Sequence, residues 1–311
     1  MHYIRHYGIS PYNEALRETL ENQYGIDVEV LIGFETGAPK FFVFDVSDLH
    51  PEIDQLNQIL PEETTEDLTA TALDPQRRDP VPFVSIIYMP QHSQDELRNA
   101  QWLDVRNTSS KVDPANIGTV DTCQCFINKM SGSGRPLGYH EVQAEPYVLR
   151  KPLKWGRASF VSATYHQERL FCNESTLRLL EQNGFVGIQT MPVLRKSTGQ
   201  PLEDIVQIDI PHVIPDDAVV PVCGMTEFVC EQCGMHMLRW GDGRSHFGLR
   251  KGVLDESVDL WKTKPMFFGR GDVAPHSAQE QVIVSQRLYR FLVDHKLDRG
   301  FVFTPLDMIG P

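Results

Sequence analysis

Two cysteines, Cys230 and Cys233, are the residues of this sequence whose types and spacing point most directly to chemistry. They lie in the segment VCEQCGMHMLRW, residues 229–240, with two residues between the thiols and Gly234 directly after the second. A glycine there lets the backbone curl so that its N–H groups face the sulfurs. This pattern is typical of half of a zinc ribbon, in which two further ligands complete a tetrahedron around the metal.

The other half of such a site has few candidates. Cys123 and Cys125 lie two residues apart in DTCQCF, and residues i and i+2 of an extended segment face the same side. We therefore predict a zinc site formed by Cys123, Cys125, Cys230 and Cys233, which ties distant segments together. A closed shell of four thiolates leaves no position for water or substrate, so this zinc is structural. The reserve ligands are Cys223, then His236 and His246.

Two other interpretations of the CxxC pair stay open at this point. A redox pair would be expected at a helix N-terminus after a strand, whereas the flanks of Cys230 and Cys233 look like strands. The pair can also be present without any metal. The remaining cysteine, Cys172, lies within an apolar strand and is predicted to be a buried core thiol.

Catalytic motifs are missing from the sequence. It contains no P-loop, GxGxxG, GxSxG or HExxH pattern. The segment WGDGRSHFG, residues 240–248, offers His246 with Asp242 as a possible acid–base pair, but its composition is more typical of a polar turn. We predict no catalytic residue and no enzymatic activity.

Length and charge narrow the class of protein. The chain has 311 residues, of which 41% are hydrophobic and 23% charged, which is ordinary for a globular protein. No run of about 18 apolar residues occurs, and the N-terminal segment lacks the apolar core of a signal peptide, so we expect a cytoplasmic protein away from membranes. The net charge of −13 argues against general nucleic-acid binding, and it fits either a solvated acidic surface or a surface that meets a basic partner.

The pattern of apolar residues predicts an α+β protein with mixed sheets and two domains. Residues 1–110 form a small α+β domain, with helices over 11–25 and 50–60 and an acidic linker or loop over 61–80. Residues 111–311 form a second α+β domain into which the zinc-ribbon-like knuckle is inserted.

The second domain contains a weak internal repeat. Residues 170–193 and 281–306 each read as a strand, a polar cap residue, a Leu-rich helix, a Gly-Phe pair and a strand closed by proline. The predicted caps are Asn173 and Ser285. We therefore expect a strand–helix–strand unit that is used twice.

At this point the sequence resembles a known family. The resemblance rests on three segments: FVSATYHQERLFCNESTLRLLEQNGFVGIQTMPV, the CEQCG knuckle and VIVSQRLYRFLVDHKLDRGFVFTPL. It covers roughly residues 120 to 311. The three segments look like the double-CxxCG-motif proteins, which are similar to bacterial immunity proteins that sit beside polymorphic toxins. This chain departs from the family because its TCQC, at 122–125, is one residue short of a second CxxC.

The resemblance implies a bacterial immunity protein that binds a cognate toxin and occludes its active site. An acidic surface would speed the capture of a toxin with a basic cleft, and the acidic stretches 62–67 and 203–217 are candidate contacts. The alternatives are an enzyme that reverses a toxin's modification, with His246, Asp242 and Cys172 as candidate residues, and a zinc-ribbon adaptor on nucleic acid.

Overall fold

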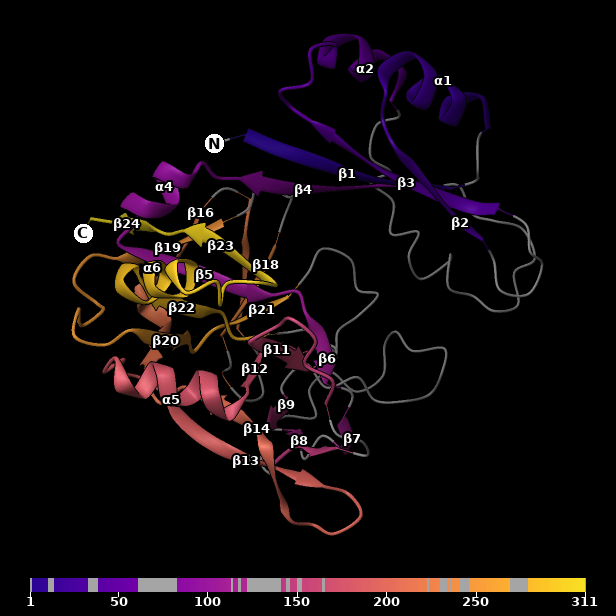
Figure 1. Cartoon of the computed structure of the whole chain (residues 1–311). Coiled ribbons are helices and arrows are strands. Elements are labelled where there is room, and N and C mark those ends of the chain that lie inside the picture. The colour runs from indigo at the N-terminus through magenta and orange to yellow at the C-terminus, as the bar shows by residue number, and fades with distance from the viewer. Residues whose placement is uncertain are drawn as a thin grey trace. The chain divides into compact units, whose positions relative to one another are not determined.

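The computed structural model confirms the α+β class, with strands predominating over helices in the residues that it describes (Figure 1). Those residues are 2–10, 14–32, 39–60, 83–112, 114–116, 119–121, 141–143, 146–149, 153–163, 166–222, 224–229, 234, 236–240, 246–268 and 279–310. They divide into two compact units, one running to Ser93 and the other starting at Gln94. Each unit has its own core.

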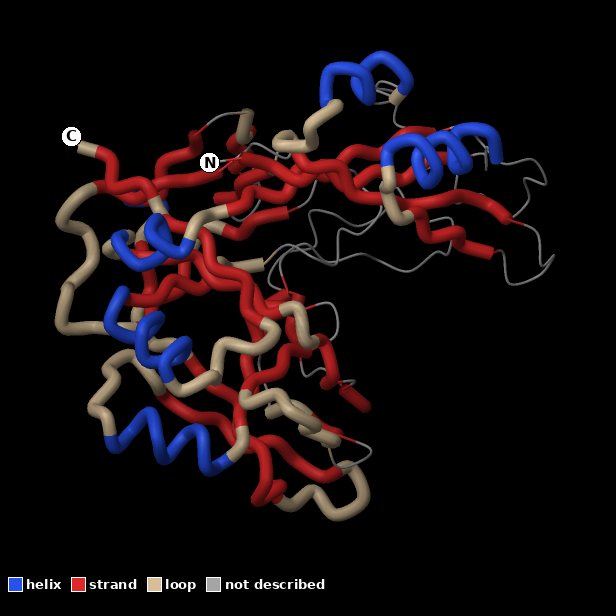
Figure 2. The backbone as a smooth tube through the Cα atoms, turned by 45° about the horizontal axis from the view of Figure 1, so that its top comes forward, coloured by secondary structure: helices blue, strands red, loops and turns tan. Residues whose placement is uncertain are grey.

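The first unit is a four-stranded antiparallel sheet with two helices against one face (Figures 1 and 2). Leu20 and Leu56, one from each helix, are fully buried in the same core as Tyr7 and Phe44 of the sheet. The strand order is β2-β3-β1-β4. The elements are β1 (His2–Ser10), α1 (Glu14–Tyr24), β2 (Val28–Ile32), β3 (Pro39–Ser47), α2 (Ile53–Ile59) and β4 (Phe83–Gln91).

This order makes the first unit a pair of split strand–helix–strand motifs. Helix α1 connects β1 to β2, and β3 lies between these two strands in the sheet. Helix α2 connects β3 to β4, and β1 lies between those two strands. This is the plan of ferredoxin-like folds. Both predicted helices are present, the strand β1 was not predicted, and the acidic segment 61–80 lies outside the described residues.

The second unit contains two larger sheets and several small ones. The seven-stranded sheet has the order β6-β11-β12-β14-β13-β10-β7, and the five-stranded sheet has the order β15-β20-β22-β5-β23. The elements are α4 (Gln94–Asn99), β5 (Trp102–Asn107), β6 (Ser110–Val112), β7 (Pro114–Asn116), β8 (Thr119–Asp121), β9 (Glu141–Gln143), β10 (Val148–Leu149), β11 (Phe160–Ala163), β12 (His166–Cys172), α5 (Glu174–Gln182), β13 (Gln189–Arg195), β14 (Pro201–Asp209), β15 (Val213–Ile214), a 3-10 turn η1 (Asp216–Ala218), β16 (Val219–Val222), β17 (Thr226–Val229), β18 (His236–Arg239), β19 (His246–Arg250), β20 (Leu260–Thr263), β21 (Met266–Phe268), β22 (Val282–Ser285), α6 (Gln286–Asp294), β23 (Phe301–Pro305) and β24 (Asp307–Ile309).

The two repeat copies adopt one split topology. In the first copy, β12-α5-β13, the antiparallel strand β14 lies between β12 and β13. In the second copy, β22-α6-β23, the antiparallel strand β5 lies between β22 and β23. Both helices contribute buried side chains to one shared core, among them Leu180 and Leu292. The predicted strand–helix–strand units are therefore present, and each is completed by a strand from outside the repeated segment.

The two repeat helices also begin in the same way. The Asn173 side chain accepts a hydrogen bond from the Thr176 backbone N–H at 2.8 Å, and the Ser285 hydroxyl accepts one from the Leu288 N–H at 3.1 Å. These contacts satisfy N–H groups that the first turn of a helix leaves unpaired. Both predicted caps are confirmed.

The helix ends match one another but differ from the prediction. The Phe185 N–H donates to the Leu180 carbonyl at 3.4 Å, and the Leu297 N–H donates to the Leu292 carbonyl at 2.7 Å. The residues that turn the chain are Gly184, at φ 65°, and Lys296, at φ 57°. The structural counterpart of Gly184 is thus Lys296, and the predicted counterpart, Gly300, lies four residues farther along.

Proline does not close both strands as predicted. Pro305 is the last residue of β23, but Pro192 lies inside β13, where the pairing with β14 shifts register between Pro192 and Leu194. A proline cannot donate a hydrogen bond to a neighbouring strand, so an irregularity at this point accommodates it.

The strand β5 corrects a second expectation. The segment SQDELRNAQWL, residues 93–103, is typical of a short helix and the residues 104–116 of a loop, whereas α4 ends at Asn99 and Trp102 begins the second strand from the edge of the five-stranded sheet. Every residue of β5 except Arg106 is buried, so the alternation of polar and apolar residues that marks a half-exposed strand is missing. This strand belongs to the second compact unit, although it precedes the boundary predicted near residue 110.

Candidate metal knuckle and adjoining pocket

The four predicted zinc ligands, Cys123, Cys125, Cys230 and Cys233, lie outside the described residues, as does the reserve ligand Cys223. The described neighbours of the CxxC segment are the strands β17 and β18, which pair antiparallel. The pairing ends at Val229 opposite His236, so residues 230–235 connect the two strands of a β-hairpin. The prediction that strands flank the knuckle is confirmed.

Gly234 has the conformation that the CxxCG pattern requires. Its φ of 70° lies in the left-handed region, which side chains other than glycine rarely adopt. No atom lies within 4 Å of the position that a Cβ would take, so the backbone conformation alone favours glycine here. A hairpin whose loop ends in a left-handed glycine fits the knuckle of a zinc ribbon.

The hairpin is anchored in a hydrophobic core. β18 pairs with β21 in parallel, with Leu238 opposite Phe267. Leu238 is fully buried, Phe267 is 1% exposed, and both pack in a cluster with Trp102 and Phe247. The strands that carry the CxxC segment are therefore held in place by apolar packing on at least one side of the hairpin.

An open pocket of about 470 Å³ adjoins the knuckle. Its wall comes from the 3-10 turn η1, from β16 and β19, and from both strands and the loop of the hairpin. The residues that line it are Asp216, Asp217, Val219, Val220, Pro221, Glu227, Val229, Gly234, His236 and Arg250.

His236 lies in this pocket between two carboxylates. Its Nδ1 lies 3.7 Å from Asp216 Oδ1 and its Nε2 lies 3.4 Å from Glu227 Oε1. Lys264 binds the other Asp216 oxygen, with Nζ at 2.5 Å. In the part of the chain that the structure describes, no three His, Cys, Asp or Glu side chains are grouped so that they can hold a metal ion. His236, one of the predicted reserve zinc ligands, therefore lies shortly after the CxxCG segment, and its two ring nitrogens lie near carboxylate oxygens.

Two of the three residues proposed for an enzymatic alternative, His246 and Cys172, are described by the structure. His246 Nε2 lies 3.1 Å from Asp307 Oδ2, and Asp242, its predicted partner, lies outside the described residues. Cys172 is fully buried, as predicted. Burial raises the pKa of its thiol to about 12, with a smaller contribution from Glu181, so the thiolate that a nucleophile needs is not formed at neutral pH.

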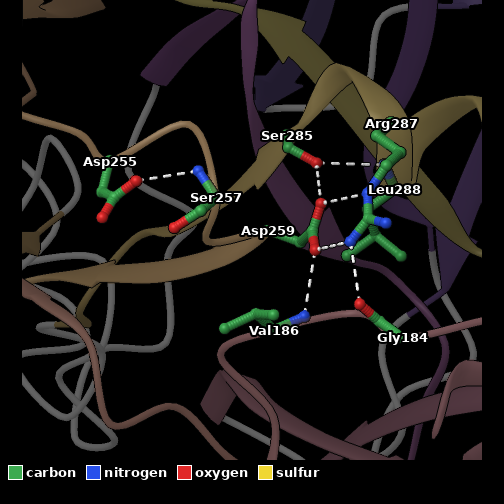
Figure 3. Close-up of polar contacts among 8 residues, drawn as sticks. All are labelled: Gly184, Val186, Asp255, Ser257, Asp259, Ser285, Arg287 and Leu288. Atoms are coloured by element: carbon green, nitrogen blue, oxygen red, sulfur yellow. Dashed lines mark hydrogen bonds and ion pairs between the residues drawn. The ribbon is translucent and has the colours of Figure 1, made fainter.

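The most connected polar group of the second unit was not predicted. The Asp259 carboxylate is 1% exposed and accepts hydrogen bonds from Ser285 Oγ at 2.6 Å, Arg287 Nε at 3.0 Å and the Val186 N–H at 3.0 Å (Figure 3). A second nitrogen of the same guanidinium also donates to Asp259, which makes the pair bidentate. The same nitrogen donates to the Gly184 carbonyl at 3.0 Å.

This network joins the end of the first repeat helix to the start of the second. Burial alone would raise the pKa of Asp259, but the hydrogen bonds from Arg287, Ser285 and the Val186 N–H outweigh it, so the pKa is lowered. The hydrogen bonds with Asp259 raise the pKa of Arg287 in turn. A buried aspartate after a loop gives no signal in the sequence that its partners are 28 and 73 residues away.

Asp104, in β5, is buried in a different way. It is 2% exposed, and its nearest ion-pair partner in the described residues is Arg106, whose Nε lies 3.6 Å from Oδ2. Its other oxygen, Oδ1, has no hydrogen-bond partner among those residues. Burial raises the pKa of Asp104 to about 6 in spite of Arg106.

Comparison of the chain with protein-family models, with curated proteins and with solved structures gives no match. Among the described helices, none has both the length and the apolar character needed to cross a membrane.

Proposed function

We propose that this chain is a bacterial immunity protein of the cytoplasm, which binds a cognate toxin and blocks its active site without catalysing a reaction. Two features of the sequence support the proposal: the resemblance of residues 120–311 to the double-CxxCG-motif proteins, and the net charge of −13. An acidic protein is attracted to a toxin whose substrate cleft is basic, as in enzymes that act on nucleic acids or nucleotides.

The observation that carries the proposal is the position of the CxxCG segment. It connects two strands of a hairpin that is fixed in a core, and it adjoins an open pocket rich in carboxylates. A concave, charged surface beside strands that are held in a core is suited to recognition, because little conformational entropy is lost when a partner binds to ordered elements.

A structural zinc ion at the knuckle is part of the same proposal. Cys230 and Cys233 would bind it with Cys123 and Cys125, and Cys223 is the first replacement for one of the latter pair. The hairpin and the left-handed Gly234 support this assignment. The ion would stabilise the loop beside the pocket and link it to a distant segment of the chain.

Co-expression tests the proposed function. The gene next to this one is expressed in a bacterial host with and without this chain, and growth is recorded together with complex formation by gel filtration. We expect the neighbouring product to arrest growth alone and to form a stable complex when this chain restores growth. A neighbouring product that is harmless, or that stays toxic and elutes separately from this chain, would contradict the proposal.

A further inference from the structure

We propose that the pocket beside the knuckle receives a basic side chain, arginine or lysine, from the protein partner. The pocket and its lining residues support a site for such a group. The assignment of that group to a toxin rests on the proposed function. The pocket combines carboxylates, which can bind the charged end of such a side chain, with an apolar wall, which can pack against its stem.

The carboxylates supply the charge that a basic group recognises. Three of them, Asp216, Asp217 and Glu227, line the pocket, against one guanidinium, that of Arg250. Asp217 is exposed, and the Glu227 side chain is 55% exposed, with His236 as its ion-pair neighbour. Acceptors are therefore accessible on two sides of the pocket, one from η1 and one from β17. A guanidinium or ammonium group can bind between them.

The positive groups nearby are already engaged. The Nε of Arg250 donates to the Asp217 carbonyl at 2.7 Å, and Lys264 is bound to Asp216. Both contacts are made to the acidic turn η1, and neither uses the Asp217 or Glu227 carboxylate. The net charge of the chain is −13. An anionic ligand would have to approach against this charge.

The apolar wall matches the stem of a long basic side chain. Val219, Val220 and Pro221 of β16 line one part of the pocket, and Val229 lines another part next to the knuckle. Val229 is 64% exposed, so its side chain is accessible to a ligand. Arginine and lysine carry three or four methylene groups before the charge, and these pack on apolar surfaces while the charged end binds acceptors. A small inorganic cation would leave this wall uncovered.

The site can be tested without knowledge of the partner by titrating the full chain with acetyl-arginine amide and recording backbone NMR spectra. Acetyl-citrulline amide, which has nearly the same shape without the charge, is the matched control. We expect saturable shifts at Val220, Val229 and Gly234 with the arginine compound and much weaker ones with citrulline. Glu227→Gln should weaken the binding by about fivefold, the upper effect of one exposed ion pair. Glu18→Gln, which changes an exposed carboxylate of α1, should leave it unchanged.

Equal shifts with both compounds, shifts outside the pocket only, or no shifts would overturn the inference. In the complex, the variant Asp217→Asn/Glu227→Gln should weaken partner binding by about tenfold or more, while the CD spectrum of the free chain stays unchanged. A complex with undiminished affinity in this variant would overturn the pocket site and leave the proposed function standing. Arginine binding in the pocket without any complex or growth rescue would reject the immunity function and leave the site standing.

Discussion

Arg287 holds Asp259 with two nitrogens while its guanidinium lies 4.7 Å from the Phe185 ring centroid. Since Phe185 follows the first repeat helix and Arg287 lies in the first turn of the second, this single side chain joins the two repeat copies. The contact adds a polar link between two units whose helices pack in one apolar core.

Arg287→Ala should destabilise the protein by about 2–4 kcal/mol. The change leaves the buried Asp259 carboxylate without its cation, and the loss is somewhat below that of a fully buried pair because the Arg287 side chain is 55% exposed. Urea unfolding followed by circular dichroism measures the change. Arg178→Ala is the control, since Arg178 forms an exposed pair with Glu174 within one helix, and it should cost at most about 0.5 kcal/mol. Equal effects of the two substitutions would show that the Arg287 contact has no special role.

Asp104→Asn should stabilise the protein at pH 7.5 by up to about 3 kcal/mol. The folded-state pKa of about 6 exceeds the ordinary 3.8, so the folded protein binds more protons than the unfolded chain between these values. Stability therefore falls as the pH rises through this window, and it stays lower above it; two pKa units correspond to about 3 kcal/mol.

The pH dependence separates this explanation from a general effect of the amide. Unfolding free energies of Asp104→Asn and the unchanged chain should differ most above pH 7 and converge as the pH falls below the ordinary value of 3.8, where Asp104 is protonated in both states. A difference that stays constant from pH 4 to pH 7.5 would exclude a raised pKa as its cause.

Lys296→Gly should raise the free energy of unfolding by about 0.5–1 kcal/mol. Lys296 has a left-handed φ of 57°, which costs about 1–2 kcal/mol for a residue with a Cβ. Glycine removes this cost, but its greater conformational freedom in the unfolded chain offsets part of the stability gained. Gly184→Ala, at the equivalent turn of the first repeat, has space for a Cβ and should lose about 1 kcal/mol. Thermal unfolding of both variants checks the pair. If both changes shift the stability in the same direction, the two turns are not equivalent.

Leu180→Ala and Leu292→Ala should each cost about 2–5 kcal/mol, because both leucines are buried in the core shared by the two helices. Leu179 of the same Leu-rich helix is only half-buried, so Leu179→Ala should cost clearly less. Chemical unfolding of the three variants checks this order. A cost at Leu179 as large as that at Leu180 would contradict the orientation of α5.

The parts of the fold that the sequence revealed are those governed by local interactions. The caps Asn173 and Ser285 and the strands beside the knuckle follow from residue types within a few positions. The strand β5 was missed because it is buried on both faces, and its partners β22 and β23 lie more than 170 residues away. The Lys296 turn was missed because lysine gives no signal for a left-handed conformation.

The candidate site was predictable only in part, for a similar reason. The CxxCG spacing predicted a knuckle whose cysteines lie outside the described residues, and Gly234 has a left-handed φ of 70°. The pocket beside it is assembled from η1, β16, β17, β18 and β19. Of its polar residues, Asp216 and Asp217 fall in the acidic stretch 203–217 that was named as a candidate contact. Their proximity to Glu227 and His236 depends on strand pairing, which a single sequence does not specify.

The proposal that zinc closes the knuckle is tested most directly by the metal content of the full chain, purified without added zinc and measured by mass spectrometry together with a count of free thiols. We predict about one zinc per chain, lost in Cys230→Ser and retained in Cys172→Ser, because four thiolates form a closed structural site and the buried thiol takes no part in it. Less than about a tenth of an equivalent of zinc, with every thiol free, would contradict the account.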